Sequence, residues 1–275
     1  MKGISSKAAA APYLIWMAVF IVVPLIMVAY FAFTDESGAF TLDNLANVAQ
    51  YSNIFIRSIW LAAISTVICL VIAYPLSYML SGMKAHTQST MLMIVMLPMW
   101  MNFLLRTYAW MAILGNNGLL NTLLGFFGLG PYKLLNTQGA VVLGMVYNYI
   151  PFMILPIYSV MVKIDKSVIE AARDLGCNSV NVLFRVILPL SFPGVASGIT
   201  MVFVPAISTF IISRMLGGGG NLLVGDLIEM QFLGNSYNPN LGAAISFVLM
   251  VILLLIMTIM NQFGEDDTEN DRVLM

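Results

Sequence analysis

The stretch that decides the fold is residues 58–83, SIWLAAISTVICLVIAYPLSYMLSGM, which contains no Asp, Glu, Lys or Arg. A charge at the centre of a bilayer costs at least about 2.5–3.5 kcal/mol, so a long charge-free apolar run is typical of a lipid-crossing helix. Similar runs cover 8–34, 85–105, 107–132, 134–162, 186–213 and 230–264. Of the 275 residues, 60% are hydrophobic and only 9% are charged. This composition excludes a soluble enzyme, a soluble nucleic-acid-binding protein and a disordered chain.

These runs predict an all-α integral membrane protein with six transmembrane helices. The expected spans are 12–34, 57–82, 90–113, 138–161, 190–213 and 242–262. Together they form one domain over 12–262, preceded by residues 1–11 and followed by an acidic tail over 263–275. Residues 115–128 are rich in glycine and asparagine and too short to cross, so we expect a loop with an interfacial helix there.

The basic residues set the expected orientation, because cytoplasmic loops carry an excess of Lys and Arg. Six spans with a cytoplasmic N-terminus place most of them inside, namely Lys2, Lys7, Lys84, Lys163, Lys166, Arg173, Arg185 and Arg272. Those left outside or at the outer boundary are Arg57, Arg106, Lys133 and Arg214. The bias therefore predicts a multi-pass protein with both termini in the cytoplasm.

The most informative polar segment is 163–193, KIDKSVIEAARDLGCNSVNVLFRVILPLSFP. Ser167 and Glu170 have the spacing of a capping box, in which each side chain satisfies an amide of the first helical turn. The apolar residues that follow recur at helical spacing and predict one apolar face, formed by Val168, Ala171, Ala172 and Leu175. We therefore expect a short amphipathic helix on the cytoplasmic side.

This helix is expected to end at Gly176, and Asn178 or Ser179 can cap a second helix that runs toward Pro189. The segment contains the string Glu170-Ala171-Ala172, then Gly176, then Val186-Ile187-Leu188-Pro189. It resembles the EAA loop of ABC importer permeases, whose pattern reads E-A-A-x3-G-x9-I-x-L-P. Val186 stands where isoleucine is usual, which is a conservative departure.

The resemblance implies the type I ABC importer permease fold, also called MetI-like, in a bacterial inner or plasma membrane. It implies that the loop forms a coupling helix that docks on a cytoplasmic ATPase. The residues assigned to this contact, within the loop 163–189, are Glu170, Ala171, Ala172, Arg173, Asp174, Gly176 and Pro189. The alternatives are that Glu170 is only a helix cap and that Gly176 is only a helix stop.

Several partners follow from the same resemblance. They are a dimer of ATPases, a second related permease subunit that makes a heterodimer, and an extracytoplasmic substrate-binding protein. ATP and Mg²⁺ are expected on the ATPase. The Gly217–Gly220 run lacks a following Gly-Lys-Ser/Thr, so we expect a mobile outer loop and no ATP site. We expect no catalytic residue, metal or cofactor on this chain.

Two further segments, 97–110 and 216–233, resemble permeases of spermidine/putrescine importers, which implies that a polyamine crosses by alternating access. A polycation needs carboxylates, carbonyls or aromatic faces along a protected path. The candidate path residues are Trp100, Asn102, Tyr108, Trp110, Tyr147, Asn148, Tyr149, Asp226 and Glu229. Each aromatic could instead belong to an interfacial belt or to bundle packing, and the two acids could lie on a solvated loop face.

Arg106 would repel a polycation, so we expect it to snorkel to the interface or to pair with an acid. Three other functions stay open: a permease of the same class for an amino acid, iron or a sulphur compound, a secondary transporter, and a membrane-embedded enzyme. A secondary transporter needs intramembrane acids, and none lies within an expected span. His86 stands alone in a short loop, which disfavours the enzyme.

Overall fold

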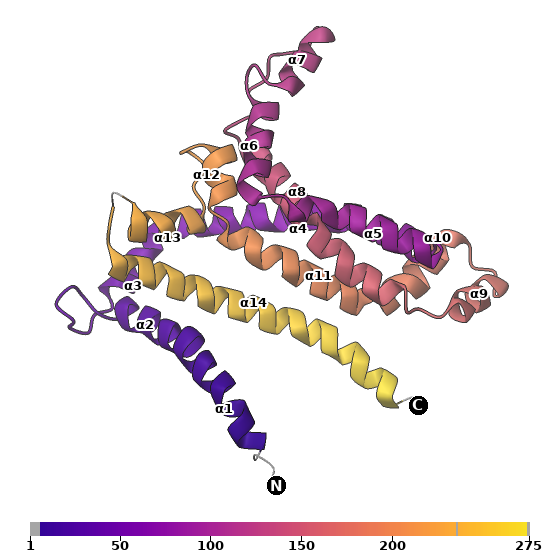
Figure 1. Ribbon diagram of the computed structural model, residues 1–275, viewed down its shortest axis with the longest axis horizontal. Helices are drawn as coiled ribbons and strands as arrows, with labels where there is room; N and C mark the ends of the chain where they lie inside the picture. Colours follow the sequence, from indigo (N-terminus) through magenta and orange to yellow (C-terminus); the bar gives the residue numbers. More distant parts are fainter. Residues whose placement is uncertain (1–5, 235, 274–275) are drawn as a thin grey trace. The chain divides into compact units, whose positions relative to one another are not determined.

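The computed structural model describes residues 6–234 and 236–273, and their side chains over 12–234 and 236–260. The described chain is nearly all helical (Figure 1). The first half contains α1 (Ser6–Met17), α2 (Val23–Ala32), α3 (Asp43–Val48), α4 (Ser52–Ser81), α5 (Ala85–Trp100), α6 (Phe103–Leu114) and α7 (Leu119–Phe126). The second half contains α8 (Gln138–Met161), α9 (Lys166–Asp174), α10 (Ser179–Val182), α11 (Leu188–Ser208), α12 (Ile211–Gly217), α13 (Val224–Leu233) and α14 (Pro239–Val273).

The lengths and apolar character of the helices confirm an all-α membrane protein. Within the described residues, five helical segments could cross a bilayer, namely Pro12–Ala32, Asp43–Ser81, Gln138–Met161, Ser179–Ser208 and Pro239–Met260. A sixth candidate is the pair Ala85–Trp100 and Phe103–Phe126, which is bent by 86°.

The bend interrupts the segment expected as the third span. Met101 has an extended backbone, and the Asn102 side-chain oxygen accepts from the amides of Leu104 at 2.8 Å and Leu105 at 3.4 Å. An asparagine in this position satisfies amides at the start of a helix, so α6 begins anew at Phe103. The helix α7 lies within the loop 115–128, where a short helix was expected.

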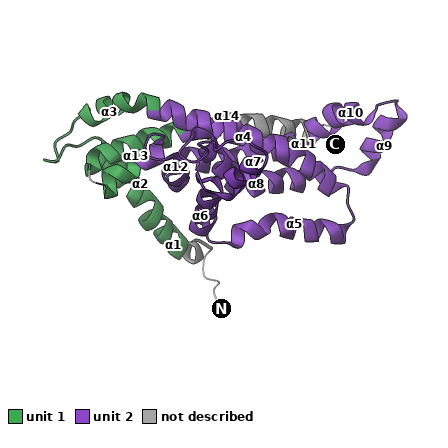
Figure 2. Cartoon of the chain, turned by 90° about the horizontal axis from the view of Figure 1, so that it is seen from above, with its two compact units in different colours: residues 1–53, 227–252 green, residues 54–226, 253–275 purple. Residues whose placement is uncertain are grey.

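The chain divides into two compact units (Figure 2). Unit 1 comprises residues 1–53 and 227–252, and unit 2 comprises 54–226 and 253–275. In unit 1, the Thr34 carbonyl accepts from Asn44 Nδ2 at 2.8 Å and from Asn240 Nδ2 at 2.6 Å. The same unit holds an edge-to-face contact between Phe33 and Phe247. These contacts join α2, α3 and the first part of α14.

Unit 2 is built around α4, α8 and α11. Its core combines Cys69, Ala73 and Leu80 of α4, Met153, Ile154, Ile157 and Met161 of α8, and Val195 and Val202 of α11. Small polar side chains link the helices: Ser77 Oγ donates to the Ile154 carbonyl at 3.2 Å, and the Tyr74 and Ser191 hydroxyls lie 3.1 Å apart. Such bonds satisfy polar groups for which the interior of a bilayer offers no hydrogen-bond partner.

The helices α8 and α11 approach closely at two glycines. A Cβ on Gly194 would lie 2.8 Å from the Pro156 carbonyl oxygen, and one on Gly198 would lie 2.8 Å from Met153 Sδ. Gly194 and Gly198 form a G-x-x-x-G pattern, which lets two membrane helices pack backbone to backbone. This packing fixes the position of α8, and α8 leads directly into the polar loop.

Two π-helical turns each precede a proline. The turn η1 (Ala18–Val22) lies before Pro24, and the turn η3 (Leu183–Ile187) lies before Pro189. Proline lacks an amide hydrogen and its ring crowds the carbonyl four residues back, so a wider turn accommodates it without ending the helix. The turn η3 therefore lets the helical chain continue without a break from α10 into α11.

Candidate functional site: the loop between α8 and α11

The start of α9 is fixed by Asp165. Its carboxylate accepts a hydrogen bond from the Ser167 amide at 2.9 Å. These contacts with Ser167 hold the pKa of Asp165 below its ordinary value of 3.8. The expected capping box of Ser167 and Glu170 is therefore wrong, because the helix begins one residue before Ser167. Glu170 takes no part in this cap, and its carboxylate is exposed.

The end of α9 follows the predicted pattern. Gly176 has a φ of +85°, and its amide bonds to the Arg173 carbonyl at 2.9 Å. The Cys177 amide bonds to the Ala172 carbonyl at 3.1 Å. This pair of bonds is a Schellman motif, which needs the left-handed conformation that glycine adopts at least cost. Asn178 then caps α10 by accepting from the Asn181 amide at 2.8 Å, so the second expected helix is also present.

The apolar residues of α9 divide between two surfaces. Ile169 and Ala172 are half-buried and pack against the core of unit 2. Val168, Ala171 and Leu175 face away and are exposed, Leu175 to 86%. The single apolar face predicted from the sequence is therefore only partly right, because Ala172 packs inward with Ile169. An exposed leucine on a short polar helix favours a surface that another protein covers.

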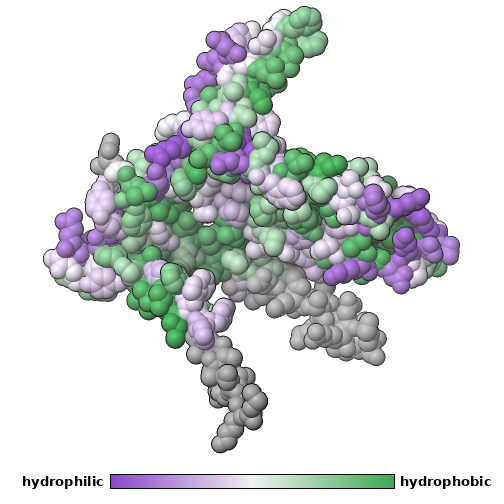
Figure 3. Space-filling model, in the orientation of Figure 1, coloured by the Kyte–Doolittle hydropathy of each residue, from purple (hydrophilic) through white to green (hydrophobic). Residues whose placement is uncertain are grey.

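Charged side chains are also exposed on α9, and two of them, Glu170 and Arg173, line a cavity against the ends of α4 and α8. Glu170, Arg173 and Asp174 are all exposed on α9. In Figure 3, hydrophilic side chains gather at the end of unit 2 where α9 and α10 lie. Pro189 stands apart from this helix, at the start of α11, where it follows the π-helical turn. The structure thus places all the predicted coupling residues except Pro189 on α9 or at its end.

The predicted path residues separate into several groups. Trp110 and Tyr147 form an edge-to-face pair with ring centroids 5.4 Å apart, which joins α6 to α8. Asn148 is buried, its Nδ2 donates to the Gly144 carbonyl, and its Oδ1 has no partner within the described residues. Tyr149 donates to the Pro205 carbonyl at 3.3 Å. Three further candidates are exposed, namely Trp100, Asn102 and Tyr108.

Arg106 is buried rather than extended to the interface, with only 8% of its surface exposed. Its guanidinium carbon lies 5.9 Å from the Phe103 ring centroid and 6.0 Å from that of Tyr147. Its Nε and Nη1 atoms have no hydrogen-bond partner among the described residues. The expectations of snorkelling and of an acidic partner are therefore both wrong for this structure, in which aromatic faces hold the cation.

The segment around α12 and the start of α13 is held by hydrogen bonds. Asp226 is 2% exposed, and its Oδ2 accepts from the Leu223 amide at 2.8 Å, so it does not lie on a solvated face. Glu229 is half-buried on α13. In the glycine run, Gly217 accepts from Asn221 Nδ2 at 2.8 Å, and Gly220 accepts from Arg57 at 3.1 Å. These bonds tie the glycine run to Asn221 and to Arg57 of α4.

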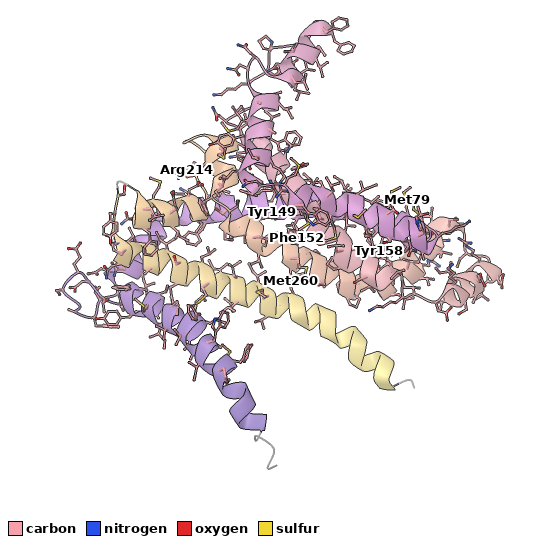
Figure 4. All side chains as sticks on the ribbon, in the orientation of Figure 1. Met79, Tyr149, Phe152, Tyr158, Arg214 and Met260 are labelled. Atoms are coloured by element: carbon pink, nitrogen blue, oxygen red, sulfur yellow. The ribbon has the colours of Figure 1, made fainter. Side chains whose placement is uncertain are left out.

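The sequence did not predict a hydrogen-bonded cluster that lies near α9. The Tyr158 hydroxyl donates to Gln88 Oε1 at 3.0 Å, and Gln88 Nε2 donates to the carbonyls of Ser81 at 3.1 Å and Met83 at 3.0 Å. Gln88 thereby ties α8 and α5 to the end of α4. Figure 4 labels Tyr158 and Met79 on the part of unit 2 nearest α9. A lone glutamine carries no sequence signal for such a role, because two of its partners are backbone carbonyls and the third, Tyr158, lies 70 residues away.

The chain matches over residues 4–264 the family described as binding-protein-dependent transport system inner membrane component. It is 39% identical over 251 residues to the spermidine/putrescine transport system permease protein PotB of Haemophilus influenzae, covering 88% of this chain and 87% of that relative. It is 34% identical over 254 residues to PotB of Escherichia coli, covering 89% and 92%.

Solved structures agree on the fold. A chain from the crystal structure of a bacterial ABC transporter involved in the import of alginate matches with a TM-score of 0.81 at 16% identity, over 94% of each chain. The MetNI methionine ABC transporter in an inward-facing conformation matches with a TM-score of 0.52 at 17% identity, over 80% of this chain and 94% of that one. This protein belongs to the family of binding-protein-dependent transport system inner membrane components, the multi-pass membrane permeases of ABC importers.

Proposed function

We propose that this chain is the permease subunit of an ATP-driven importer of polyamines, and that α9 is the helix through which an ATPase drives it. The observation that carries the proposal is the exposure of α9. Its outward apolar residues, Val168, Ala171 and Leu175, would be costly to leave in water unless a partner covered them. The relatives whose names mention spermidine and putrescine support the choice of substrate.

The fold provides a rigid link from α9 to the membrane helices. Ile169 and Ala172 pack against the core of unit 2, which contains the ends of α4, α8 and α11. A push on the outer side of α9 is therefore passed through packed side chains to these helices. Packed interiors resist compression, so a displacement of α9 moves helices as bodies rather than being absorbed locally.

The proposed cycle is alternating access. An extracytoplasmic binding protein delivers the polyamine, and a dimer of ATPases binds ATP with Mg²⁺ and closes on the cytoplasmic side. This chain contributes one coupling helix, so a second related permease contributes the other, and both termini lie in the cytoplasm. Acidic and aromatic side chains would carry the polycation, and we assign the path to the candidates Trp100, Asn102, Tyr108, Trp110, Tyr147, Asn148, Asp226 and Glu229.

The experiment is uptake of radiolabelled spermidine by the complete transporter reconstituted in proteoliposomes, with ATP hydrolysis measured in parallel. Glu170→Ala is the decisive variant, because Glu170 does not cap α9 and alanine preserves a helix. We expect it to lower uptake and polyamine-stimulated hydrolysis by roughly tenfold, as loss of a central interface contact does. Glu36→Ala, which removes an exposed carboxylate elsewhere in the chain, is the matched control and is expected to transport normally.

Two results would contradict the proposal in different ways. Coupled transport of an amino acid, iron or a sulphur compound, without ATP-dependent spermidine uptake, would refute the polyamine substrate while leaving the coupling role of α9 intact. Normal uptake and normal stimulation of hydrolysis in Glu170→Ala would refute the assigned coupling role of Glu170.

A further inference from the structure

A cavity separates the membrane-facing side of α9 from the ends of α4 and α8. Its volume is about 560 Å³, within the range of about 300–1,000 Å³ that is typical of ligand pockets. All of its walls belong to unit 2. The cavity lies where the apolar segments Asp43–Ser81 and Gln138–Met161 both end, so it is placed at a boundary between membrane and water.

One part of the cavity is apolar. Met79 and Met83 line it from the end of α4, Met161 and Val162 from the end of α8, and Ile169 from α9. Met79, Met83 and Val162 are exposed, so this wall is open to whatever surrounds the chain. Methionine side chains are flexible and polarisable, and they adapt to ligands of irregular shape.

The other part of the cavity is charged. Lys166 and Arg173 line it from α9, together with Glu170 between them in the sequence. Neither basic side chain forms a hydrogen bond or ion pair with another residue that the structure describes. Two cations against one carboxylate leave a net charge of +1 at the rim, next to an apolar wall.

We propose that this cavity binds an anionic phospholipid, with the phosphate at Lys166 and Arg173 and an acyl chain along Met79, Met83 and Met161. Basic pockets at the ends of membrane helices suit anionic head groups, and each Lys or Arg near the surface strengthens the attraction. The lipid would lie between α9 and α4 and would thereby set the position of α9. This inference does not depend on the transported substrate.

Other occupants fit the cavity less well. Within the tail over 263–275, the acidic run 265–271 has the right charge but contains no apolar side chain for the methionine wall, because the apolar residues of the tail lie outside that run. A polyamine would meet two cations at the rim. Inorganic phosphate would satisfy the basic groups and leave the apolar wall uncovered. A phospholipid alone among these matches both parts.

The test is native mass spectrometry of the delipidated full-length chain, titrated with phosphatidylglycerol or phosphatidylcholine of the same acyl composition. We expect the wild type to bind phosphatidylglycerol preferentially, and the Lys166→Gln, Arg173→Gln double variant to lose roughly tenfold or more in affinity for it. The matched control is Arg57→Gln with Lys133→Gln, which removes two basic residues elsewhere and should leave affinity unchanged. Met79→Trp, which fills the apolar wall and keeps the charges, should also weaken binding.

Several results would overturn the proposal. Equal loss of affinity in both double variants would mean that the lipid responds to overall charge and not to this cavity. Equal binding of phosphatidylcholine would remove the role of the basic pair. Displacement of the lipid by inorganic phosphate would indicate an ion site. Binding that appears only after removal of residues 263–275 would assign the cavity to the tail. The helical content and the size-exclusion profile of each variant are measured as well, to check that the variant is folded.

Discussion

The carboxylate of Asp165 accepts a hydrogen bond from the amide of Ser167 at 2.9 Å, and this contact starts the helix α9. Removing a cap of this kind destabilises the start of the helix, because the Ser167 amide loses its side-chain acceptor. We expect Asp165→Ala to increase hydrogen–deuterium exchange of the α9 amides by roughly fivefold in the full-length chain. Asp165→Asn should behave as the wild type, because asparagine caps equally well. Equal exchange in Asp165→Ala and the wild type would show that packing alone holds α9.

The same carboxylate predicts how α9 responds to pH. Its folded pKa lies below the ordinary value of 3.8, because the Ser167 contacts stabilise the charged form. The stabilisation is therefore fully present above pH 3.8 and is lost as pH falls through the lower folded pKa. We expect α9 amides of the wild type to lose protection in that window relative to Asp165→Asn. Parallel loss of protection in the two proteins would rule out Asp165 as the titrating group.

The close approach of α8 and α11 predicts the effect of enlarging Gly198. A Cβ there would lie 2.8 Å from Met153 Sδ and 3.2 Å from the Met153 carbonyl oxygen. We expect Gly198→Ala to destabilise the fold by about 1–3 kcal/mol, because the interface has no room to relax. Gly125→Ala is the matched control, since nothing lies within 4 Å of a Cβ there, and it should be neutral or slightly stabilising. Thermal unfolding in detergent measures both, and an equal melting temperature for the two variants would contradict the packing argument.

The buried Arg106 predicts an unusual gain of stability. Its Nε and Nη1 atoms lack partners among the described residues, and unsatisfied buried donors cost about 1–3 kcal/mol. We expect Arg106→Met to raise the melting temperature of the isolated chain, because methionine keeps the packing against Phe103 and Tyr147 without the charge. Arg57→Met should lower it slightly, since Arg57 donates to the Gly220 carbonyl at 3.1 Å. A lower melting temperature for Arg106→Met would mean that the guanidinium is satisfied.

The local sequence patterns in the loop after α8 predicted only part of its structure. Gly176 ends α9 as predicted, and Asn178, one of the two predicted caps, is the residue that caps α10, because each acts through its own backbone or its nearest amides. The capping residue was misjudged because Asp165 and Ser167 are both good caps two residues apart, and spacing cannot choose between them. The predicted apolar face of α9 was only partly right, because helical periodicity defines an apolar stripe. It does not show which part of that stripe packs against the rest of the protein.

Longer-range features depended on contacts that no local pattern contains. Asn102 caps α6 at the break in the third predicted span, a role that no pattern in the sequence indicated. Gln88 joins α5 and the neighbouring end of α4 to Tyr158 of α8, which lies 70 residues away in the sequence, so no motif marked it. The G-x-x-x-G pattern at Gly194 and Gly198 was visible in the sequence and could have predicted the close pairing of α11 with another helix.

The central claim is that the outward side of α9 is the surface that an ATPase covers. Leu175 tests it most directly, because its side chain is 86% exposed and only its backbone takes part in the C-cap of α9. Leu233 on α13 is a matched control, since it is 81% exposed and lies on a different helix. A charge in a buried interface costs more than one at a free surface.

The measurement is the affinity of the purified ATPase for the permease complex in nanodiscs, compared between Leu175→Asp and Leu233→Asp. The account predicts that Leu175→Asp weakens binding by roughly tenfold or more, while Leu233→Asp binds as the wild type does. Wild-type affinity in Leu175→Asp, or an equal loss in both variants, would contradict it.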